Sequence, residues 1–274
     1  MTSLAADKTI DVVVAAIRDD GGQVRIFDLR AANGKTLPPF APGDHVAVQC
    51  GAEIVRHYSL CGPQDDATVY RIAVKREAES RGGSRWMHQS LAVGGHLAIS
   101  APRSNFSLLR GCAAYFFVSG GIGLTPVLAM LDALGREGKR ARLLHQCRSP
   151  ADLAFASELR CLGEHHDIEI HVDSLAGGFR NLDADLDRLS PESEVYCCGP
   201  GPMMAIVRAH GERTGRIGHY HFESFAAAPA VSENRPFMAV IASTGQEIAV
   251  AADETLLAAL RREGFDIESE CEEG

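Results

Sequence analysis

The sequence predicts a multidomain chain: an antiparallel β-barrel, then a doubly wound α/β domain, then a short third segment. Three observations lead to this fold class. Alternating strands divided by turns fill the first hundred residues, strands and helices alternate from about residue 113, and a small, proline-punctuated stretch follows residue 225. The 274 residues also exceed the usual length of one domain. We expect domains at 1–110, 111–226 and 237–274, with a linker at 227–236.

The first domain is predicted from hydrophobic alternation, which indicates strands with one buried face. Gly21-Gly22 and Asn33-Gly34 have the composition of hairpin turns. A helical pattern at 84–92 interrupts the strands. The expected strands cover 9–20, 21–30, 44–50, 55–60, 68–77 and 94–102.

The second domain is predicted from alternating strands and helices. Continuous apolar strands such as AYFFV suit a parallel sheet that is covered on both faces. The expected strands cover 113–120, 140–147, 167–174, 194–199 and 219–225, and the helices 126–138, 151–163 and 202–213. After the linker, residues 237–265 predict a hairpin and a short helix capped by Asp253 or Thr255.

Charge and composition exclude several function classes. The net charge of −9 disfavours nucleic-acid binding, which needs a basic surface. No apolar run approaches the roughly 20 residues of a membrane span, and the first residues lack the pattern of a signal peptide. We therefore expect a cytoplasmic protein with neither a membrane nor a nucleic acid as partner.

Cysteines and histidines give no sign of a metal site. The eight cysteines stand in no pattern with zinc spacing, which predicts reduced thiols. His165 and His166 fall in a polar turn and are predicted to be surface residues.

A glycine turn at 118–131, VSGGIGLTPVLAML, has the pattern of a dinucleotide site. Glycines let the backbone approach phosphates, and the start of the following helix offers free N–H groups. The motif is incomplete, because Pro126 stands where the third glycine belongs and no acidic residue closes the second strand. A tight strand-to-helix turn without a ligand is the alternative.

Two stretches of the first domain suggest a second ligand site. In SRGGSRWMH, Arg81 and the two following glycines precede Ser84, a predicted helix N-cap that could bind one compact anion or simply cap the helix. In RHYSL, Tyr58 could lie against a planar ring while Arg56 and Ser59 form hydrogen bonds.

Six motifs, in this order and spacing, carry a resemblance: RHYSL, RGGS, PRSNFSL, GGIGLTP, YCCGPGPMM and HFESF. They resemble the FMN-containing reductases of the phthalate dioxygenase reductase family, within the ferredoxin reductase superfamily. The resemblance covers nearly the whole chain. It implies an FMN-binding barrel, an NAD-binding α/β domain and a ferredoxin-like β-grasp segment.

The resemblance also implies site residues, although core packing is the alternative for each side chain. The implied flavin-binding residues are Arg56, His57, Tyr58, Ser59, Ile72, Ala73 and Val74, with Arg81, Gly83 and Ser84 at the phosphate. The implied nicotinamide-side residues are Gly120, Gly121, Gly123, Thr125, Cys198 and Gly199. Phe225 would cover a face of the flavin, and Arg148 follows the second strand of the α/β domain. Hydride transfer needs positioning rather than an acid or base, so the expected catalytic residues are Cys198, Thr125, Phe225 and Ser59.

The implied function is the reductase component of a Rieske-type oxygenase system, with electrons passing from NADH to FMN, to a [2Fe-2S] cluster and to the terminal oxygenase. Such a flavin converts a two-electron donor into one-electron steps. The alternatives are a stand-alone flavin or ferric reductase, an electron-transfer subunit of another enzyme, and a flavin-binding module without turnover. NADH is expected rather than NADPH.

The last ten residues, FDIESECEEG, raise a further expectation. Cys271 resembles the first cluster ligand of a plant-type ferredoxin domain, whose other ligands do not follow. We therefore expect a truncated ferredoxin domain, with [2Fe-2S] only in an untruncated protein. The acidic residues of this segment could steer the protein to its oxygenase partner, or could simply be solvated.

Overall fold

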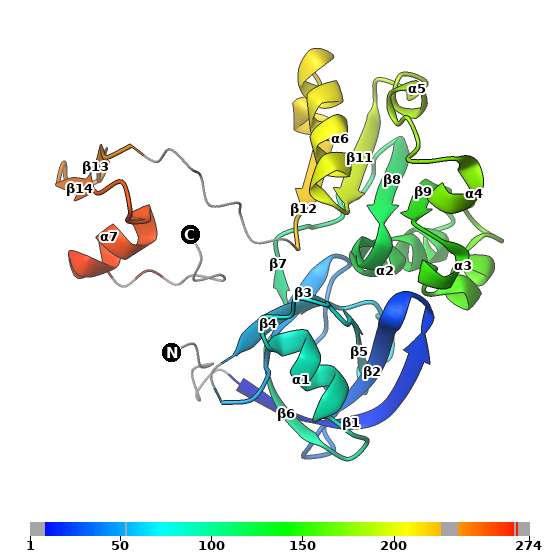
Figure 1. The fold of residues 1–274 in the computed structure, drawn as a ribbon, viewed down its shortest axis with the longest axis horizontal. Coiled ribbons are helices and arrows are strands. Elements are labelled where there is room, and N and C mark those ends of the chain that lie inside the picture. Colours follow the sequence, from blue (N-terminus) through cyan, green and yellow to red (C-terminus); the bar gives the residue numbers. More distant parts are fainter. Residues whose placement is uncertain (1–8, 53, 226–234, 266, 268–274) are drawn as a thin grey trace. The chain divides into compact units, whose positions relative to one another are not determined.

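The computed structural model describes residues 9–52, 54–225, 235–265 and 267, and the chain forms two compact units, 1–225 and 226–274 (Figure 1). The domain limits expected inside the first unit, and the linker at 227–236, stay predictions. Cys271 lies outside the described residues.

An antiparallel sheet of seven strands forms the first half of unit 1. Its order is β4-β3-β6-β1-β2-β5, with β7 paired to β3, and the end strands β4 and β5 contact each other. The strands are β1 (Thr9–Asp20), β2 (Val24–Ala31), β3 (Asp44–Gln49), β4 (Val55–Ser59), β5 (Tyr70–Lys75), β6 (His96–Ser100) and β7 (Arg103–Ser104), with helix α1 (Gly83–Gln89) between β5 and β6. Side chains such as Phe27, Val48 and Ile72 fill the interior. This is the curled antiparallel β domain that hydrophobic alternation predicts.

One of the two predicted hairpins is present. Gly21 and Gly22 lie in the 3-10 turn η2 (Gly21–Gln23), which joins the paired strands β1 and β2. The hairpin predicted at Asn33-Gly34 is wrong: these residues form a turn after β2, but β2 pairs with β1 and β5 rather than with the next strand. A turn sequence fixes a local reversal, whereas the partner of the following strand depends on the whole sheet.

A parallel sheet of five strands forms the second half of unit 1, in the order β10-β9-β8-β11-β12. Its strands are β8 (Ala114–Gly120), β9 (Arg142–Cys147), β10 (Asp167–Val172), β11 (Ser193–Cys198) and β12 (Tyr220–Glu223). The helices are α2 (Leu124–Arg136), α3 (Ala156–Leu162), α4 (Asp173–Ala176), α5 (Asp183–Leu186) and α6 (Gly201–Arg213). Three 3-10 turns, η3 (Gly121–Gly123), η4 (Pro150–Asp152) and η5 (Ile217–His219), join them.

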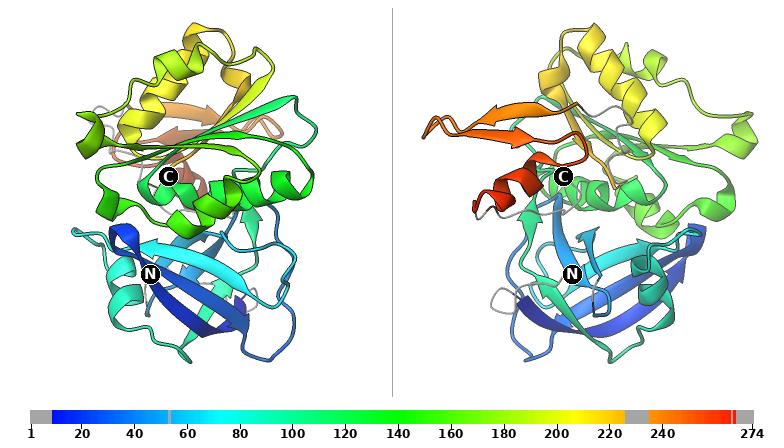
Figure 2. Two further views of the ribbon diagram at one scale, coloured as in Figure 1. Left: turned by 90° about the vertical axis from the view of Figure 1, so that its right-hand side faces the viewer. Right: turned by 60° about the vertical axis from the view of Figure 1, so that its left-hand side comes forward.

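Helices cover both faces of this sheet, as Figure 2 shows for α2 and α3 on one face and α6 on the other. Alternate residues of β8 therefore enter two cores: Phe117 packs with the α2 side, and Phe116 with the α6 side. This explains why the strand is apolar throughout. The doubly wound fold that the sequence predicts is confirmed.

The α2 side of the sheet also packs on the barrel. Val24, Ile26 and Ala73 of the barrel share one core with Leu124 and Leu128 of α2. Burial of this shared apolar surface holds the two halves of unit 1 together.

Two local predictions in the α/β half are wrong. The helix predicted at 151–163 is broken: η4 ends at Asp152, Phe155 has a φ of 60°, and α3 begins at Ala156. His166, predicted at the surface, is only 2% exposed, since its ring donates to the Leu131 carbonyl and accepts from the Ala141 N–H.

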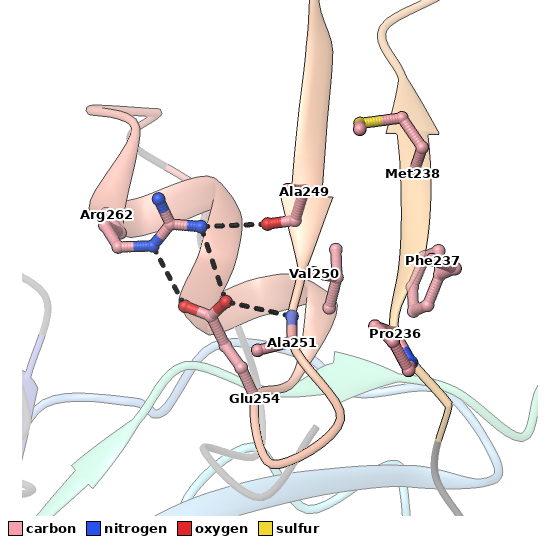
Figure 3. A pocket seen from close by; sticks show the side chains of 8 residues that line it. All are labelled: Pro236, Phe237, Met238, Ala249, Val250, Ala251, Glu254 and Arg262. Carbon is pink, nitrogen blue, oxygen red and sulfur yellow. Dashed lines mark hydrogen bonds and ion pairs between the residues drawn. The ribbon is translucent and has the colours of Figure 1, made fainter.

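Unit 2 contains the hairpin of β13 (Phe237–Val240) and β14 (Glu247–Val250), followed by α7 (Leu256–Arg262). Of the two predicted caps, Thr255 is the one observed, since its side chain accepts from the Ala258 N–H. Figure 3 shows the residues that line a groove in this unit, where Arg262 pairs with Glu254 and donates to the Ala249 carbonyl. These contacts hold the end of α7 against β14.

Within the described residues, no helix is long and apolar enough to cross a membrane. The seven cysteines of the described part are all free thiols.

A cluster of charges supports α5. Asp185 is 2% exposed and accepts two hydrogen bonds from Arg180, at 2.7 and 3.0 Å, and one from Arg142 at 2.9 Å. These hydrogen bonds, foremost that of Arg180, lower the pKa of the Asp185 carboxyl. The carboxylate joins α5 to β9 and to the loop before α5.

We predict that Asp185→Ala destabilises the protein by about 3 kcal/mol, because two half-buried guanidinium groups lose a buried carboxylate and keep only the more exposed Glu169 as a shared partner. The midpoint of thermal unfolding should fall by roughly 6–10 °C. Asp183→Ala, on the same helix, removes an exposed carboxylate that lies 3.5 Å from Arg213, and serves as the control. It should cost less than about 1 kcal/mol. Equal losses in the two variants would contradict the prediction.

Candidate functional site

A cavity of about 230 Å³ opens in unit 1 and is lined by both of its halves. β4, β5 and the segment before α1 contribute the barrel side, while the glycine turn and the end of the unit contribute the other. The lining residues are Arg56, His57, Tyr58, Ser59, Ala73, Val74, Lys75, Glu77, Glu79, Ser80, Arg81, Gly83, Ser84, Ile122, Thr125 and Phe225. Most residues that the sequence singled out on the barrel side therefore meet at one cavity.

Arginines and serines gather where β4 meets the start of α1. Arg56 donates to the carbonyls of Val55, at 2.7 Å, and Arg81, at 3.3 Å, which ties β4 to the loop before α1. A Cβ at Gly83 would lie 2.6 Å from Cγ of Arg56, so only glycine allows this approach. Guanidinium groups beside serine hydroxyl groups suit a phosphate.

The predicted N-cap at Ser84 is wrong. The helix begins at Gly83, and Gly82, with a φ of 100°, occupies the cap position because the sharp turn requires glycine there. Ser84 lies in the first turn and donates to the hydroxyl of Ser80. Ser80, which the sequence analysis did not single out, accepts from the N–H groups of Gly82 and Arg85.

The middle of the cavity offers an aromatic side chain and a polar atom without a partner. Ser59 is 4% exposed, and its hydroxyl oxygen has no hydrogen-bond partner. Tyr58 lines the same cavity, and burial raises its pKa, so that its ring stays neutral. Burial also raises the pKa of the neighbouring Cys50 thiol to about 11. A buried hydroxyl without a partner is uncommon, and a bound ligand would satisfy it.

The α/β side contributes Ile122 and Thr125 of the glycine turn. Thr125 is 2% exposed and donates to the Ile122 carbonyl at 3.0 Å, which closes the turn onto α2. Phe225 is 46% exposed on the cavity wall. A half-exposed aromatic residue at a cavity suits contact with a planar ligand.

Several other sequence-predicted residues lie outside the cavity lining. Ile72 is fully buried in the barrel core. Gly123 packs against the Cys198–Gly199 backbone, where a Cβ would lie 2.2 Å from the Cys198 carbonyl oxygen. The remaining residues absent from the lining are Gly120, Gly121, Arg148, Cys198 and Gly199.

Cys198 is a buried thiol at the end of β11. Its pKa is raised well above the usual range, chiefly by burial, so the sulfur is protonated at neutral pH. A protonated, buried thiol is a poor nucleophile. Among the described residues no cluster of histidine, cysteine and acidic side chains could hold a metal ion. The arrangement can hold and orient ligands, and Cys198 lies in the core that β11 shares with α2.

Glu223 is the residue that sequence reasoning missed. It pairs with Cys198 in the register of β11 and β12. Its Oε2 atom is buried and has no hydrogen-bond partner, and burial raises the pKa of the carboxyl to about 7. The motif HFESF contains it, but only the parallel pairing of the two strands places a carboxyl beside Cys198.

The comparisons with known proteins agree with this geometry. Residues 117–209 match the oxidoreductase NAD-binding domain family. The chain is 33% identical to phthalate dioxygenase reductase of Burkholderia cepacia, covering all of this chain and 86% of that one. It is 35% identical to the toluene-4-sulfonate monooxygenase system reductase subunit of Comamonas testosteroni, covering 97% of this chain and 84% of that one.

Solved structures show the same similarity. The structure of phthalate dioxygenase reductase, described as modular for electron transfer from pyridine nucleotides to [2Fe-2S], matches with a TM-score of 0.76 and 32% identity over 98% of this chain and 84% of that one. An intact type IV self-sufficient cytochrome P450 monooxygenase matches with a TM-score of 0.81 and 32% identity. That match covers all of this chain but only 36% of the monooxygenase.

The raised pKa of Glu223 has a consequence for stability. The folded protein keeps a proton that the unfolded chain releases above pH 4.5, the ordinary pKa of the group. Its contribution is therefore complete below about pH 4.5 and is lost as the pH rises to about 7.

We predict that Glu223→Gln removes this dependence. Relative to the unsubstituted protein, the variant should gain about 2–3 kcal/mol between pH 5 and pH 8, because an amide does not ionise. Thermal midpoints of both proteins at the two pH values measure the change. The same difference in midpoint at both pH values would show that Glu223 ionises as it does in water.

Proposed function

Since the chain belongs to the phthalate dioxygenase reductase family, we propose that it is an NADH-dependent flavoprotein that binds FMN and supplies electrons to the oxygenase component of a multicomponent system. The observation that carries the proposal is the cavity lined jointly by the barrel and the glycine turn. It offers anion-binding, aromatic and hydrogen-bonding groups on one side, and the turn of a nucleotide-binding domain on the other.

The residues present fit a flavin. Ser59 has a buried hydroxyl in need of a partner, and Tyr58 adds an aromatic ring beside it. Ser59, Tyr58 and the backbone of Ala73 and Val74 would hold the ring system. When bound, a flavin can accept a hydride and release the two electrons one at a time.

FMN is proposed over FAD because the cationic end of the cavity suits a single terminal phosphate. Arg81, Arg56 and Ser84 line this end together with the backbone of Gly83. Guanidinium groups bind phosphate oxygens through two parallel N–H donors, which suits a dianion. FMN release on heating supports this choice, and release of FAD overturns it.

The positioning residues have distinct roles in the proposal. Thr125, held by its hydrogen bond to the Ile122 carbonyl, fixes the glycine turn against which the coenzyme binds. Phe225 covers the open side of the cavity and excludes water. Cys198 keeps its proton and fills space behind the turn, and it acts in the hydride step by packing rather than as an acid or base.

The proposed acceptor is an oxygenase component, since the relatives are reductase subunits of oxygenase systems. A [2Fe-2S] cluster is the one-electron relay that the family implies, and its expected ligand Cys271 lies outside the described residues. The similarity to a self-sufficient cytochrome P450 favours a second candidate, an electron-transfer module serving a haem monooxygenase. Reduction of purified candidate acceptors distinguishes the two.

Anaerobic stopped-flow mixing with NADH tests the enzymatic proposal. The protein, loaded with FMN, should lose its flavin absorbance on a turnover timescale of roughly 1–1,000 s⁻¹. If NADH does not change the flavin absorbance, only the alternative of a flavin-binding module without turnover remains.

We predict that Arg81→Ala weakens FMN binding at least about 10-fold, which corresponds to about 1.4 kcal/mol. Binding of riboflavin, which lacks the phosphate, should change less than about 2-fold, because only a phosphate contact is lost. Fluorescence titration of the apoprotein measures both affinities. The control is Arg85→Ala, which removes an exposed arginine of α1 that does not line the cavity. Equal weakening of FMN and riboflavin would assign Arg81 a structural role instead.

A further inference from the structure

The segment after β9 contains residues that bear on whether the coenzyme is NADH or NADPH. In dinucleotide-binding α/β domains, the end of the second strand contacts the adenosine ribose, where an acidic residue accepts from a 2′-hydroxyl or an arginine holds a 2′-phosphate. Here β9 ends at Cys147, and Arg148 and Ser149 follow. Those residue types would suit a 2′-phosphate.

Asp152 interacts with both Arg148 and Ser149. The Ser149 hydroxyl donates to its carboxylate at 2.7 Å, and the Arg148 guanidinium lies 3.5 Å from the same group. The hydrogen bond from Ser149, helped by the charges of Arg148 and Lys75, lowers the pKa of Asp152. The protein's own anion therefore stands where a phosphate would bind, and it is ionised at neutral pH.

The barrel holds Asp152 in this position. The turn η4 contacts η2, the tip of the β1–β2 hairpin, which reaches the α3 side of the sheet in Figure 1. A Cβ at Gly21 would lie 2.1 Å from the Leu153 carbonyl oxygen, and the Phe155 N–H donates to Asp20. Contacts this close leave η4 little room to swing aside for a larger ligand.

We propose that Asp152 determines the preference for NADH over NADPH. Its carboxylate engages Ser149 and Arg148, repels a 2′-phosphate, and keeps lone pairs that accept from a 2′-hydroxyl. Arg148 thereby orients Asp152 instead of binding phosphate. The inference rests on the proposed function, because it concerns the coenzyme of that reaction.

The first test compares kcat/KM for the two coenzymes with ferricyanide as electron acceptor. Asp152→Ala should raise kcat/KM for NADPH at least about 10-fold and lower that for NADH, with flavin reduction at saturating NADH changed less than about 2-fold. Asp152→Asn, which keeps the shape and removes the charge, should shift the ratio in the same direction. Asp167→Ala removes an exposed carboxylate at the opposite end of the sheet and should leave the ratio unchanged.

Arg148 provides a second comparison. In the double variant Asp152→Ala, Arg148→Ala, most of the gain with NADPH should disappear, because the freed guanidinium binds the added phosphate and only the relief of repulsion remains. A gain that persists in full without Arg148 would overturn the assigned mechanism.

A binding measurement makes the test independent of turnover. Isothermal titration with 2′,5′-ADP and with 5′-AMP probes the ribose site alone. Asp152→Ala should tighten 2′,5′-ADP about 10-fold and leave 5′-AMP unchanged or weaker. The inference is overturned if Asp152→Ala changes neither the ratio of kcat/KM for NADPH and NADH nor the ratio of the affinities for 2′,5′-ADP and 5′-AMP. A protein that is inert toward NADH and NADPH overturns the proposed function instead, and the titration then still decides the role of Asp152.

Discussion

The packing of the barrel against the α2 face of the parallel sheet is the constraint on which the rest depends. Val24 and Ala73 of the barrel and Leu124 of α2 share one core, so the two halves of unit 1 are fixed relative to each other. This brings β4 and β5 to the same cavity as Thr125 of the glycine turn. The close contact between Gly123 and the Cys198 carbonyl extends that rigidity to the neighbouring strand. A ligand site shared by the two halves needs this kind of fixed support.

Much of the fold follows from local patterns in the sequence. Hydrophobic alternation predicts the curled antiparallel sheet, and the continuous apolar run of β8 predicts a strand buried on both faces. On the barrel side of the cavity, RHYSL predicts a strand that carries Arg56 and Ser59, and RGGS predicts a turn into a helix beside Arg81; both elements are present. Patterns of this kind depend on neighbours in the chain, which the sequence displays directly.

Most of the failures share one physical cause, which is contact between residues distant in sequence. The helix expected at 151–163 is interrupted near Leu153, where the backbone packs closely against Gly21 of the β1–β2 hairpin. His166 is buried because carbonyl and amide groups of other elements satisfy its ring. The position of Glu223 beside Cys198 depends on the pairing of β12 with β11. The contact of Asp152 with Ser149 depends on the fold of the turn η4. No periodicity or motif encodes such contacts.

The central claim is that both halves of unit 1 build one cavity for a flavin next to the coenzyme turn. The most direct measurement is a crystal structure of the protein loaded with FMN and soaked with NAD⁺. The account predicts a flavin that contacts Ser59 on one side and Thr125 on the other, with its phosphate at Arg81. A flavin bound elsewhere, or a cavity filled only by solvent at saturating FMN, would contradict it.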